Sequence, residues 1–248
     1  MKILAICGSP RKGNTYSALR TIQDNFPDVE YEIVMLKDIQ FQLCKGCYSC
    51  VLRGEEKCPI KDDRDMLIQK IHEADGLIVA SPVYSHMVPA LMKNLFDRFG
   101  FYAHRPAFFE KYAMSMVTCS GYGGEHASQF MDKSLSIYGF NLAPSLELHC
   151  KPGRDAELQK RENTQKIVLG VNAFLAKIQE GGKDKPSLAK LIPFGIFKAI
   201  AEAAKDTMPA DYRYYKNKSD YYYDTDLPFF KKWMAKKIVK KEVDKILK

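Results

Sequence analysis

Five short apolar runs, rich in branched residues, recur along the chain and are separated by segments with helical periodicity. The runs are residues 2–7, 31–36, 76–81, 112–119 and 145–150. Runs of this length that are apolar on both faces are typical of strands buried inside a parallel sheet. Amphipathic segments such as 16–26 and 88–99 supply the helices that connect one strand to the next. The sequence therefore predicts an α/β fold with a doubly wound, five-stranded parallel sheet.

A change of composition after residue 182 predicts a domain boundary. Residues 1–182 carry 22 Lys and Arg against 21 Asp and Glu, whereas residues 183–248 carry 16 against 9. We interpret 183–248 as a basic helical extension, with a polar loop rich in tyrosine at 210–224 and a basic amphipathic helix after Pro228. The positive charge favours an anionic partner or a solvated lysine-rich face.

Composition places the chain among ordinary globular proteins. Hydrophobic residues make up 46% of its 248 residues and charged residues 27%. No apolar run reaches the roughly 18–20 residues needed to span a bilayer. The apolar start of the chain leads directly into a glycine loop and lacks the features of a secretory signal. We therefore expect a cytoplasmic protein, in which the odd number of cysteines, seven, argues against a disulfide framework.

The segment GSPRKGNT, residues 8–15, follows the first predicted strand and opens the first predicted helix. Backbone amides and the positive end of the helix dipole converge at such a turn and form an anion site. The side chains of Ser9, Asn14 and Thr15 add donors, and Arg11 and Lys12 add charge. The spacing matches neither a dinucleotide fingerprint nor an ATP P-loop. A loop of this kind suits a terminal phosphate monoester such as that of flavin mononucleotide (FMN).

Two further loops follow predicted strands, SPVYSHMVP at 81–89 and SGYGGE at 120–125. Ligands of open parallel sheets bind at the carboxyl ends of the strands, so we expect the three loops to converge. The residues predicted to enclose a flat ring are Pro82, Val83, Tyr84, Ser120, Gly121, Gly123 and Gly124. The glycines would let the backbone approach the ring closely.

GSPRKGNT, the cysteine cluster that ends before Asp62, and ADGLIVASPVYSHMVPALMKNLFDR together resemble the NADPH-dependent FMN reductase family. More narrowly, they resemble its iron–sulfur flavoprotein branch. The resemblance spans about residues 1–150 and implies a flavodoxin-like fold, FMN at the strand ends and a homodimer or tetramer. It assigns the phosphate to Ser9, Arg11, Asn14 and Thr15, and the isoalloxazine to 82–84 and 121–124.

Four of the seven cysteines lie at Cys44, Cys47, Cys50 and Cys58. The first three share the spacing of a bacterial ferredoxin run, and the set is able to ligate a [4Fe–4S] cluster. The spacing fits zinc less well, because the cysteine ligands of zinc sites usually come as two separated Cys-x-x-Cys-type pairs. Plain or redox-active thiols remain a further alternative. The other three, Cys7, Cys119 and Cys150, are interpreted as core residues.

The leading hypothesis is an FMN-dependent NAD(P)H oxidoreductase in which NAD(P)H passes a hydride to N5 of FMN. The electrons then reach a quinone, a nitroaromatic, free flavin or a protein acceptor. FMN carries this chemistry, so no residue is nominated as a general base. One alternative is an iron–sulfur flavoprotein that carries electrons through a [4Fe–4S] cluster. Another is a binding protein that uses the basic tail and keeps the flavodoxin-like fold as a scaffold.

Overall fold

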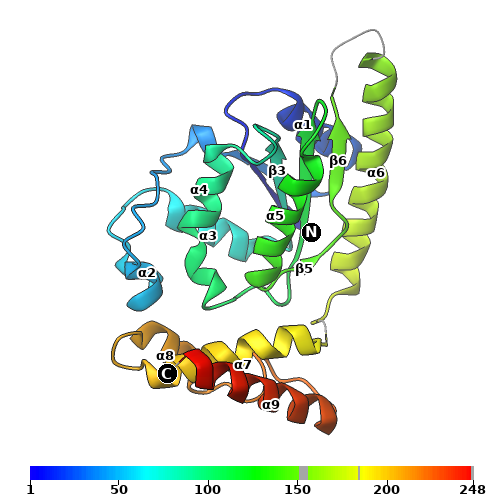
Figure 1. Ribbon diagram of the computed structural model, residues 1–248. Helices are drawn as coiled ribbons and strands as arrows, with labels where there is room; N and C mark the ends of the chain where they lie inside the picture. Colours follow the sequence, from blue (N-terminus) through cyan, green and yellow to red (C-terminus); the bar gives the residue numbers. More distant parts are fainter. Residues whose placement is uncertain (151–155, 184, 247–248) are drawn as a thin grey trace. The chain divides into compact units, whose positions relative to one another are not determined.

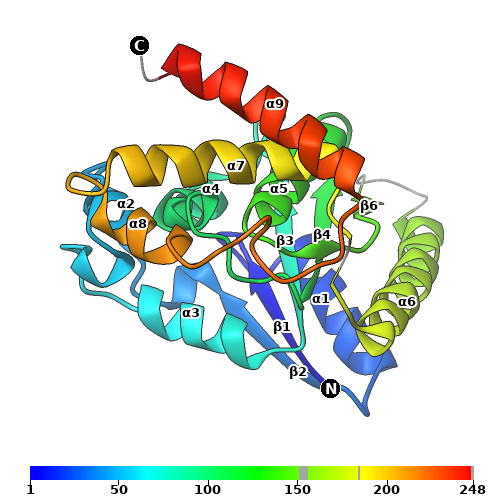
Figure 2. The ribbon, with the colours of Figure 1, turned by 90° about the horizontal axis from the view of Figure 1, so that it is seen from below.

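The strands of the N-terminal part form one parallel sheet. The computed structural model describes residues 1–150, 156–183 and 185–246. The sheet has the order β2 (Glu30–Met35), β1 (Lys2–Cys7), β3 (Gly76–Pro82), β4 (Tyr112–Cys119), followed by β5 (Asn141–Leu142) and β6 (Leu146–His149), both beside β4 (Figure 1 and Figure 2). The predicted flavodoxin-like parallel sheet with five strand positions is confirmed.

The fifth position differs from the prediction in one detail. Its strand is divided into β5 and β6, of which the sequence analysis expected only the second. The Ala143 amide still donates to the Ala113 carbonyl at 2.9 Å, but the next residue, Pro144, has no N–H to offer. The ladder therefore breaks at Pro144 and resumes at β6.

Helices cover both faces of this sheet. α1 (Asn14–Asn25) and α6 (Ala156–Glu180) lie on one face, and α3 (Arg64–Glu73), α4 (Ala90–Arg98) and α5 (Gly124–Ile137) lie on the other (Figure 2). Alternate side chains of a strand point to opposite faces. Ile3 and Cys7 of β1 accordingly pack in one buried cluster with Leu19 of α1 and Phe174 of α6. This layered arrangement leaves the carboxyl ends of the strands free for a site.

The chain divides into two compact units. The first contains Met1–Cys44, Lys61–Phe99 and Ala107–Gly182, and the second contains Lys45–Ile60, Gly100–Pro106 and Lys183–Lys248. The second unit therefore combines the predicted C-terminal extension with two segments that the sequence analysis placed in the first domain. Among the described residues, no helix is both long and apolar enough to cross a membrane.

The second unit has a core of its own. Its helices are α2 (Ser49–Leu52), α7 (Leu188–Ala203), α8 (Pro209–Tyr215) and α9 (Phe229–Ile246), and α7 packs along α9. The tyrosine-rich segment is not the polar loop that we expected. Tyr215 is 1% exposed and Tyr221 is 5% exposed, and both contact the ring of Phe194. The tyrosines therefore build the interior of this unit.

Candidate functional site

The turn between β1 and α1 is folded by its own side chains. Ser9, 3% exposed, donates from Oγ to the Arg11 carbonyl at 2.7 Å and accepts from the Arg11 amide at 3.3 Å. The hydroxyls of Thr15 and Thr118 share a hydrogen bond of 2.6 Å, which ties the first turn of α1 to the end of β4. α1 begins at Asn14, after a glycine that has no side chain to cap it. Its first amides have no partner within the helix, an arrangement that is able to bind an anion.

A cavity of about 700 Å³ lies beside this turn, at the carboxyl ends of the strands. Eight of the residues predicted to bind FMN line it: Ser9, Arg11, Asn14, Thr15, Pro82, Val83, Tyr84 and Ser120. The described lining does not include the other four, Lys12, Gly121, Gly123 and Gly124. The structure thus brings the three predicted loops together, with the end of β6 and part of α6 as additional walls.

Two glycines of the loop before α5 have a packing role. Gly123 has a φ of +88°, and a Cβ there would lie 2.5 Å from the Cα of His86. A Cβ on Gly124 would lie 2.2 Å from the carboxyl carbon of Glu147. The sequence analysis interpreted both glycines as room for a ligand. In the structure they make room for the neighbouring loop and for the end of β6.

The loop after β3 is a tight reversal. The amide of Tyr84 donates to the carbonyl of Met87 at 2.8 Å, and the amide of Met87 donates to the carbonyl of Tyr84 at 3.0 Å. The two residues between them, Ser85 and His86, have φ values of +48° and +63°. Residues other than glycine rarely adopt this left-handed conformation. The reversal places Tyr84 at the cavity and holds His86 against Gly123.

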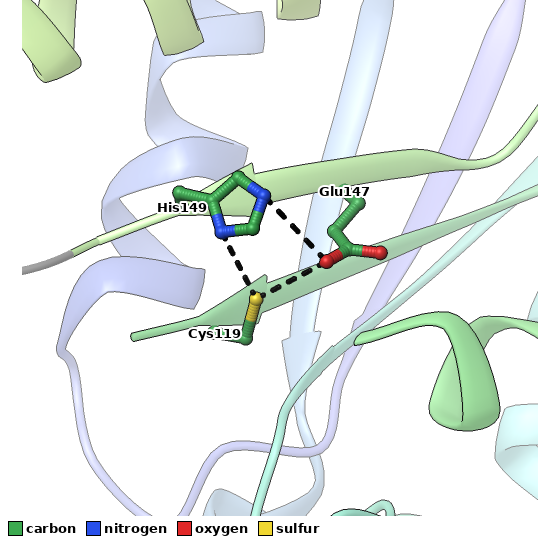
Figure 3. Close-up of side chains that lie close together, drawn as sticks. All are labelled: Cys119, Glu147 and His149. Atoms are coloured by element: carbon green, nitrogen blue, oxygen red, sulfur yellow. Dashed lines mark hydrogen bonds and ion pairs between the residues drawn. The ribbon is translucent and has the colours of Figure 1, made fainter. Parts of the chain in front are cut away.

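Cys119, Glu147 and His149 point toward one another from the ends of β4 and β6 (Figure 3). Cys119 Sγ lies 3.4 Å from Glu147 Oε1 and 3.5 Å from His149 Nδ1. His149 Nε2 lies 3.7 Å from Glu147 Oε1. Cys119 and His149 also line the cavity. A thiolate, an imidazole and a carboxylate are ligands that zinc accepts, so the group is able to hold a divalent ion once the thiol has lost its proton.

The electrostatics of this group keep the thiol protonated. Burial first, and then the hydrogen bond with Glu147 and the charge of Glu147, raise the pKa of Cys119 to about 11. At neutral pH Cys119 therefore acts as a weak S–H donor, and its sulfur is a poor nucleophile.

Glu147 and His149 were not predicted as site residues, and the sequence pattern favoured Cys119 only as a core residue. The signal was present in the segment LELH, where Glu147 and His149 are two residues apart and so share one face of the strand. They also end the last strand of a parallel sheet, at the edge where ligands bind.

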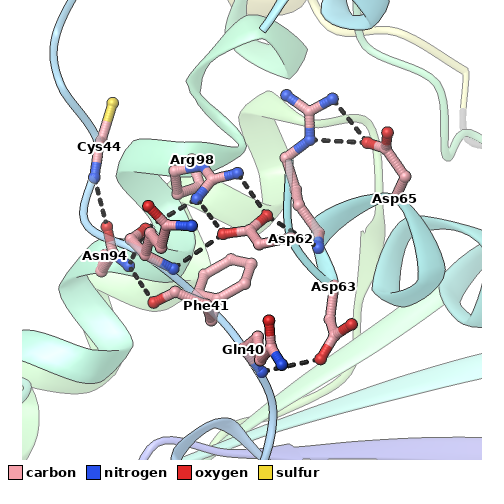
Figure 4. A network of polar contacts seen from close by, with 10 residues as sticks. Gln40, Phe41, Cys44, Asp62, Asp63, Asp65, Asn94 and Arg98 are labelled. Atoms are coloured by element: carbon pink, nitrogen blue, oxygen red, sulfur yellow. Dashed lines mark hydrogen bonds and ion pairs between the residues drawn. The ribbon is translucent and has the colours of Figure 1, made fainter. Parts of the chain in front are cut away.

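Polar side chains hold the chain as it approaches the cysteine loop, residues 44–58 (Figure 4). The Gln42 amide donates to Asp62 Oδ2 at 2.8 Å, and the Gln42 carbonyl accepts from Arg98 Nη1 at 2.7 Å. Asn94 Nδ2 donates to the same carbonyl at 3.0 Å. Asn94 Oδ1 accepts from the amide of Cys44 at 3.0 Å. The backbone up to the first cysteine of the loop is therefore bonded to α4 and to the start of α3.

The centre of that network is a buried ion pair. Arg98 donates from Nη1 to Asp62 Oδ2 at 2.7 Å and from Nη2 to Asp62 Oδ1 at 2.8 Å, and both side chains are almost fully buried. Burial alone would raise the pKa of Asp62. The hydrogen bonds from Arg98 and from the amides of Gln42 and Arg64, with the charge of Arg98, lower the pKa below its ordinary value. Asp62 is therefore an anion that holds the loop in place.

The thiols of the loop form no disulfide with any described cysteine, and their environments differ. Cys44 and Cys47 are exposed, Cys50 is half-buried and Cys58 is buried. The Ser49 amide, as the largest influence, lowers the pKa of Cys47, which favours the thiolate that a metal requires.

The distances between the thiols bear on which metal centre they are able to ligate. In the second unit as described, the thiols of Cys47, Cys50 and Cys58 are not all within 4.8 Å of one another, as the ligands of a single ion would be. A four-iron cluster keeps its thiolates farther apart, because the irons lie between them. These three thiols are thus not arranged around a single metal ion, and the [4Fe–4S] assignment stays a prediction.

Residues 1–151 match the model of the family described as NADPH-dependent FMN reductase. The chain belongs to this family. The match covers the sheet, the turn at 8–15, the loops that line the cavity and the cysteine loop. It confirms the resemblance that the sequence motifs carried.

Relatives of this FMN reductase family member are named iron–sulfur flavoproteins. One from Archaeoglobus fulgidus is 38% identical over 145 residues, which cover 56% of this chain and 64% of that protein. One from Methanosarcina thermophila is 40% identical over 103 residues, 40% of this chain and 52% of that protein. One from Clostridioides difficile is 27% identical over 209 residues, 81% and 89% of the two chains. The chain spans about half to two thirds of the length of the first relatives that it matches.

Solved structures share the fold at low identity. The NAD(P)H:quinone oxidoreductase from Methanothermobacter marburgensis superposes with a TM-score of 0.57 at 19% identity, over 69% of this chain and 95% of that one. RosB with bound 8-demethyl-8-formylriboflavin-5′-phosphate gives a TM-score of 0.54 at 14% identity, over 92% of each chain. These likenesses establish the flavodoxin-like arrangement of this FMN reductase family member and leave its substrate to be proposed.

Proposed function

We propose that the protein is an FMN-dependent NAD(P)H oxidoreductase. The observation that carries the proposal is the single cavity in which the phosphate turn at 8–15 meets the loops at 82–84 and 118–120. Membership of the NADPH-dependent FMN reductase family supports it. When bound, FMN would accept a hydride from NAD(P)H and pass electrons to a quinone, a nitroaromatic, free flavin or a protein acceptor.

The residues of the cavity suit FMN. The amides at the start of α1, the side chain of Asn14 and the guanidinium of Arg11 would hold the phosphate. Pro82, Val83 and Tyr84 would form an apolar wall with backbone groups for a flat ring. The imidazole of His149, which also lines the cavity, would contribute a hydrogen bond to the ligand.

The test is flavin retention and turnover by the full chain. Protein saturated with FMN should oxidise NADH or NADPH without oxygen when a quinone, a nitroaromatic or free flavin is added. Asn14→Ala should weaken FMN binding and leave the fold unchanged, since Asn14 is an exposed residue on the first turn of α1. A chain that takes up no FMN under any condition would contradict the proposal.

A second candidate is an iron–sulfur flavoprotein that carries electrons through a [4Fe–4S] cluster on Cys44, Cys47, Cys50 and Cys58. The names of the relatives favour it, and so does the lowered pKa of Cys47. Protein purified without oxygen should then contain iron and acid-labile sulfide in addition to FMN. Cys47→Ser should remove the iron and leave the FMN, because Cys47 is not among the residues that line the cavity.

We further propose a cytoplasmic homodimer or homotetramer, as the family resemblance implies, to be measured by light scattering.

The basic α9 suggests an anionic partner. Phe229, Phe230 and Trp233 are exposed at its start, and the ammonium of Lys237 lies 5.3 Å from the Trp233 ring centre. Binding to an anionic surface should weaken steeply with added salt. Binding that ignores salt would contradict this role.

A further inference from the structure

Arg105 lies at the centre of a polar network inside the second unit. Its Nη2 donates to the Cys50 carbonyl at 2.6 Å, and its Nη1 donates to the Val51 carbonyl at 3.0 Å. Nη2 also donates to Glu55 Oε2 at 3.1 Å, and Nη1 donates to the carboxylate of Asp211. Arg105 is 7% exposed and Asp211 is 2% exposed, so this ion pair is shielded from water, whereas Glu55 is half exposed.

The two carbonyls that Arg105 binds belong to α2, which is only four residues long. A helix this short is not stable by itself, because a single turn of helix is costly to nucleate. The chain before it passes through left-handed backbone at Gly46, with a φ of +62°, and Tyr48, with a φ of +56°. The conformation from Cys47 to Cys50 therefore depends on the guanidinium more than on local preference.

Asp211 connects this guanidinium to the C-terminal segment. It lies on α8, and its other oxygen pairs with His104 Nδ1 at 2.8 Å. The Tyr215 hydroxyl donates to the His104 carbonyl at 2.7 Å, and Arg213 Nη2 donates to the Arg53 carbonyl at 3.1 Å. α8 therefore bonds both to the segment that carries Arg105 and to the cysteine loop, within one unit. Removal of Asp211 would take the buried counter-ion away from Arg105.

We propose that the C-terminal segment is a positioning element for the cysteine loop. Asp211 holds Arg105, and Arg105 fixes the turn from Cys47 to Cys50 in the conformation in which its thiolates ligate a metal–sulfur cluster. Arg105 and Asp211 touch no thiol themselves and act through the Cys50 and Val51 carbonyls. This inference rests on the iron–sulfur candidate function. It assigns a role to residues 183–248, which the phosphate turn and the cavity do not require.

The first test compares Asp211→Asn with Asp220→Asn in the full-length chain. Asp220 is a matched control, because it pairs with Lys232 at 2.7 Å in the same unit but makes no bond to Arg105. Groups that hold metal ligands in place typically change metal affinity by about 10- to 100-fold when they are removed. After anaerobic reconstitution with iron and sulfide, Asp211→Asn should lose its cluster to a chelator at about one tenth of the chelator concentration that wild type tolerates. Asp220→Asn should behave as wild type, and FMN content should be equal in all three.

A double variant separates positioning from folding. Arg105→Met with Asp211→Asn removes both buried charges, so no unpaired buried charge remains to unfold the unit, and the carboxylate of Glu55, which also loses its partner, is half exposed to solvent. The hydrogen bonds to the Cys50 and Val51 carbonyls are still absent. The double variant should regain the thermal unfolding midpoint of wild type, yet its cluster should stay chelator-labile and its electron paramagnetic resonance spectrum should differ from that of wild type.

Amide hydrogen exchange tests the same inference without iron. Exchange of residues 45–58 should be faster in Asp211→Asn than in wild type or Asp220→Asn. If wild type takes up no iron, the iron–sulfur function fails, and the exchange measurement still decides whether Asp211 holds the loop. If wild type holds a cluster and Asp211→Asn matches it in chelator resistance and in exchange, the positioning role is refuted.

Discussion

Arg11 supplies a cationic side chain from the phosphate turn to the cavity wall. Replacing it by Gln should weaken FMN binding by about 10- to 150-fold, because a charge-assisted hydrogen bond to phosphate is worth about 1.5–3 kcal/mol. Riboflavin, which lacks the phosphate, should bind the variant as well as it binds wild type. Fluorescence titration with both flavins measures this difference.

Lys12→Gln is a control that removes a positive charge from the same turn without changing a described residue of the cavity lining. Lys12 Nζ lies 5.3 Å from the centre of the Tyr16 ring, and Lys12 is absent from the described lining of the cavity. Its FMN affinity should stay near that of wild type. Equal losses for FMN and riboflavin in Arg11→Gln would mean that the arginine shapes the loop instead of binding phosphate.

Glu147 helps burial to keep the proton on Cys119. The pKa of Cys119 is raised to about 11, so its alkylation should be slow at pH 8 and should accelerate as the pH rises toward that value. Glu147→Gln removes a charge that disfavours the thiolate, and the pKa should fall. It should stay above the ordinary 9.0, because burial is the larger cause. The alkylation rate at pH 8–9 should therefore increase.

Mass spectrometry of the Cys119 peptide in FMN-free protein provides the rate. Cys150 is an internal reference, since burial alone raises its pKa, and its rate should not respond to the substitution. An unchanged rate at Cys119 would show that the Glu147 charge does not reach the thiol.

At the scale of the elements, the reversal at Tyr84–Met87 is built from residues that do not favour it. Ser85 and His86 both have positive φ, where Asn followed by Gly is preferred. Ser85→Asn with His86→Gly should therefore raise the free energy of unfolding by about 1 kcal/mol. Lys133→Gly, on the exposed face of α5, should lower the free energy of unfolding by about the same amount, because glycine is unfavourable in a helix.

Denaturant titration compares the three proteins. A double variant that is less stable than wild type would show that the contacts of His86 contribute more to stability than its backbone strain costs.

The elements that the sequence predicted well are those decided by local pattern. β1, β3 and β4 are continuous apolar runs, and α4 has a clean apolar stripe, so period and length were sufficient. β5 was missed because it has two residues, too few for any periodicity. The pairing of Cys119 with His149 depends on the register between two strands, which no single segment contains.

At the scale of the whole molecule, the second unit could not be predicted from the sequence. Its three segments are separated by long stretches of chain, and the contacts that join them are specific pairs such as Arg105 with Asp211. Tyr215 and Tyr221 looked polar because their neighbours in sequence are charged, yet their rings pack against Phe194. Composition correctly predicted that this segment is basic and helical, but it did not predict that the tyrosines form its core.

The division into two units predicts where FMN will act on stability. Every described residue of the cavity lining belongs to the first unit. A ligand present at about 100 times its Kd stabilises the structure that binds it by about 2.7 kcal/mol. Hydrogen exchange of the most protected amides in β4 and α1 should therefore slow by about 100-fold with FMN, whereas α7 and α9 should exchange as before. Arg11→Gln at the same FMN concentration should show a smaller effect. Equal slowing in both units would mean that they unfold together, and that the C-terminal segment shares the stability of the flavin site.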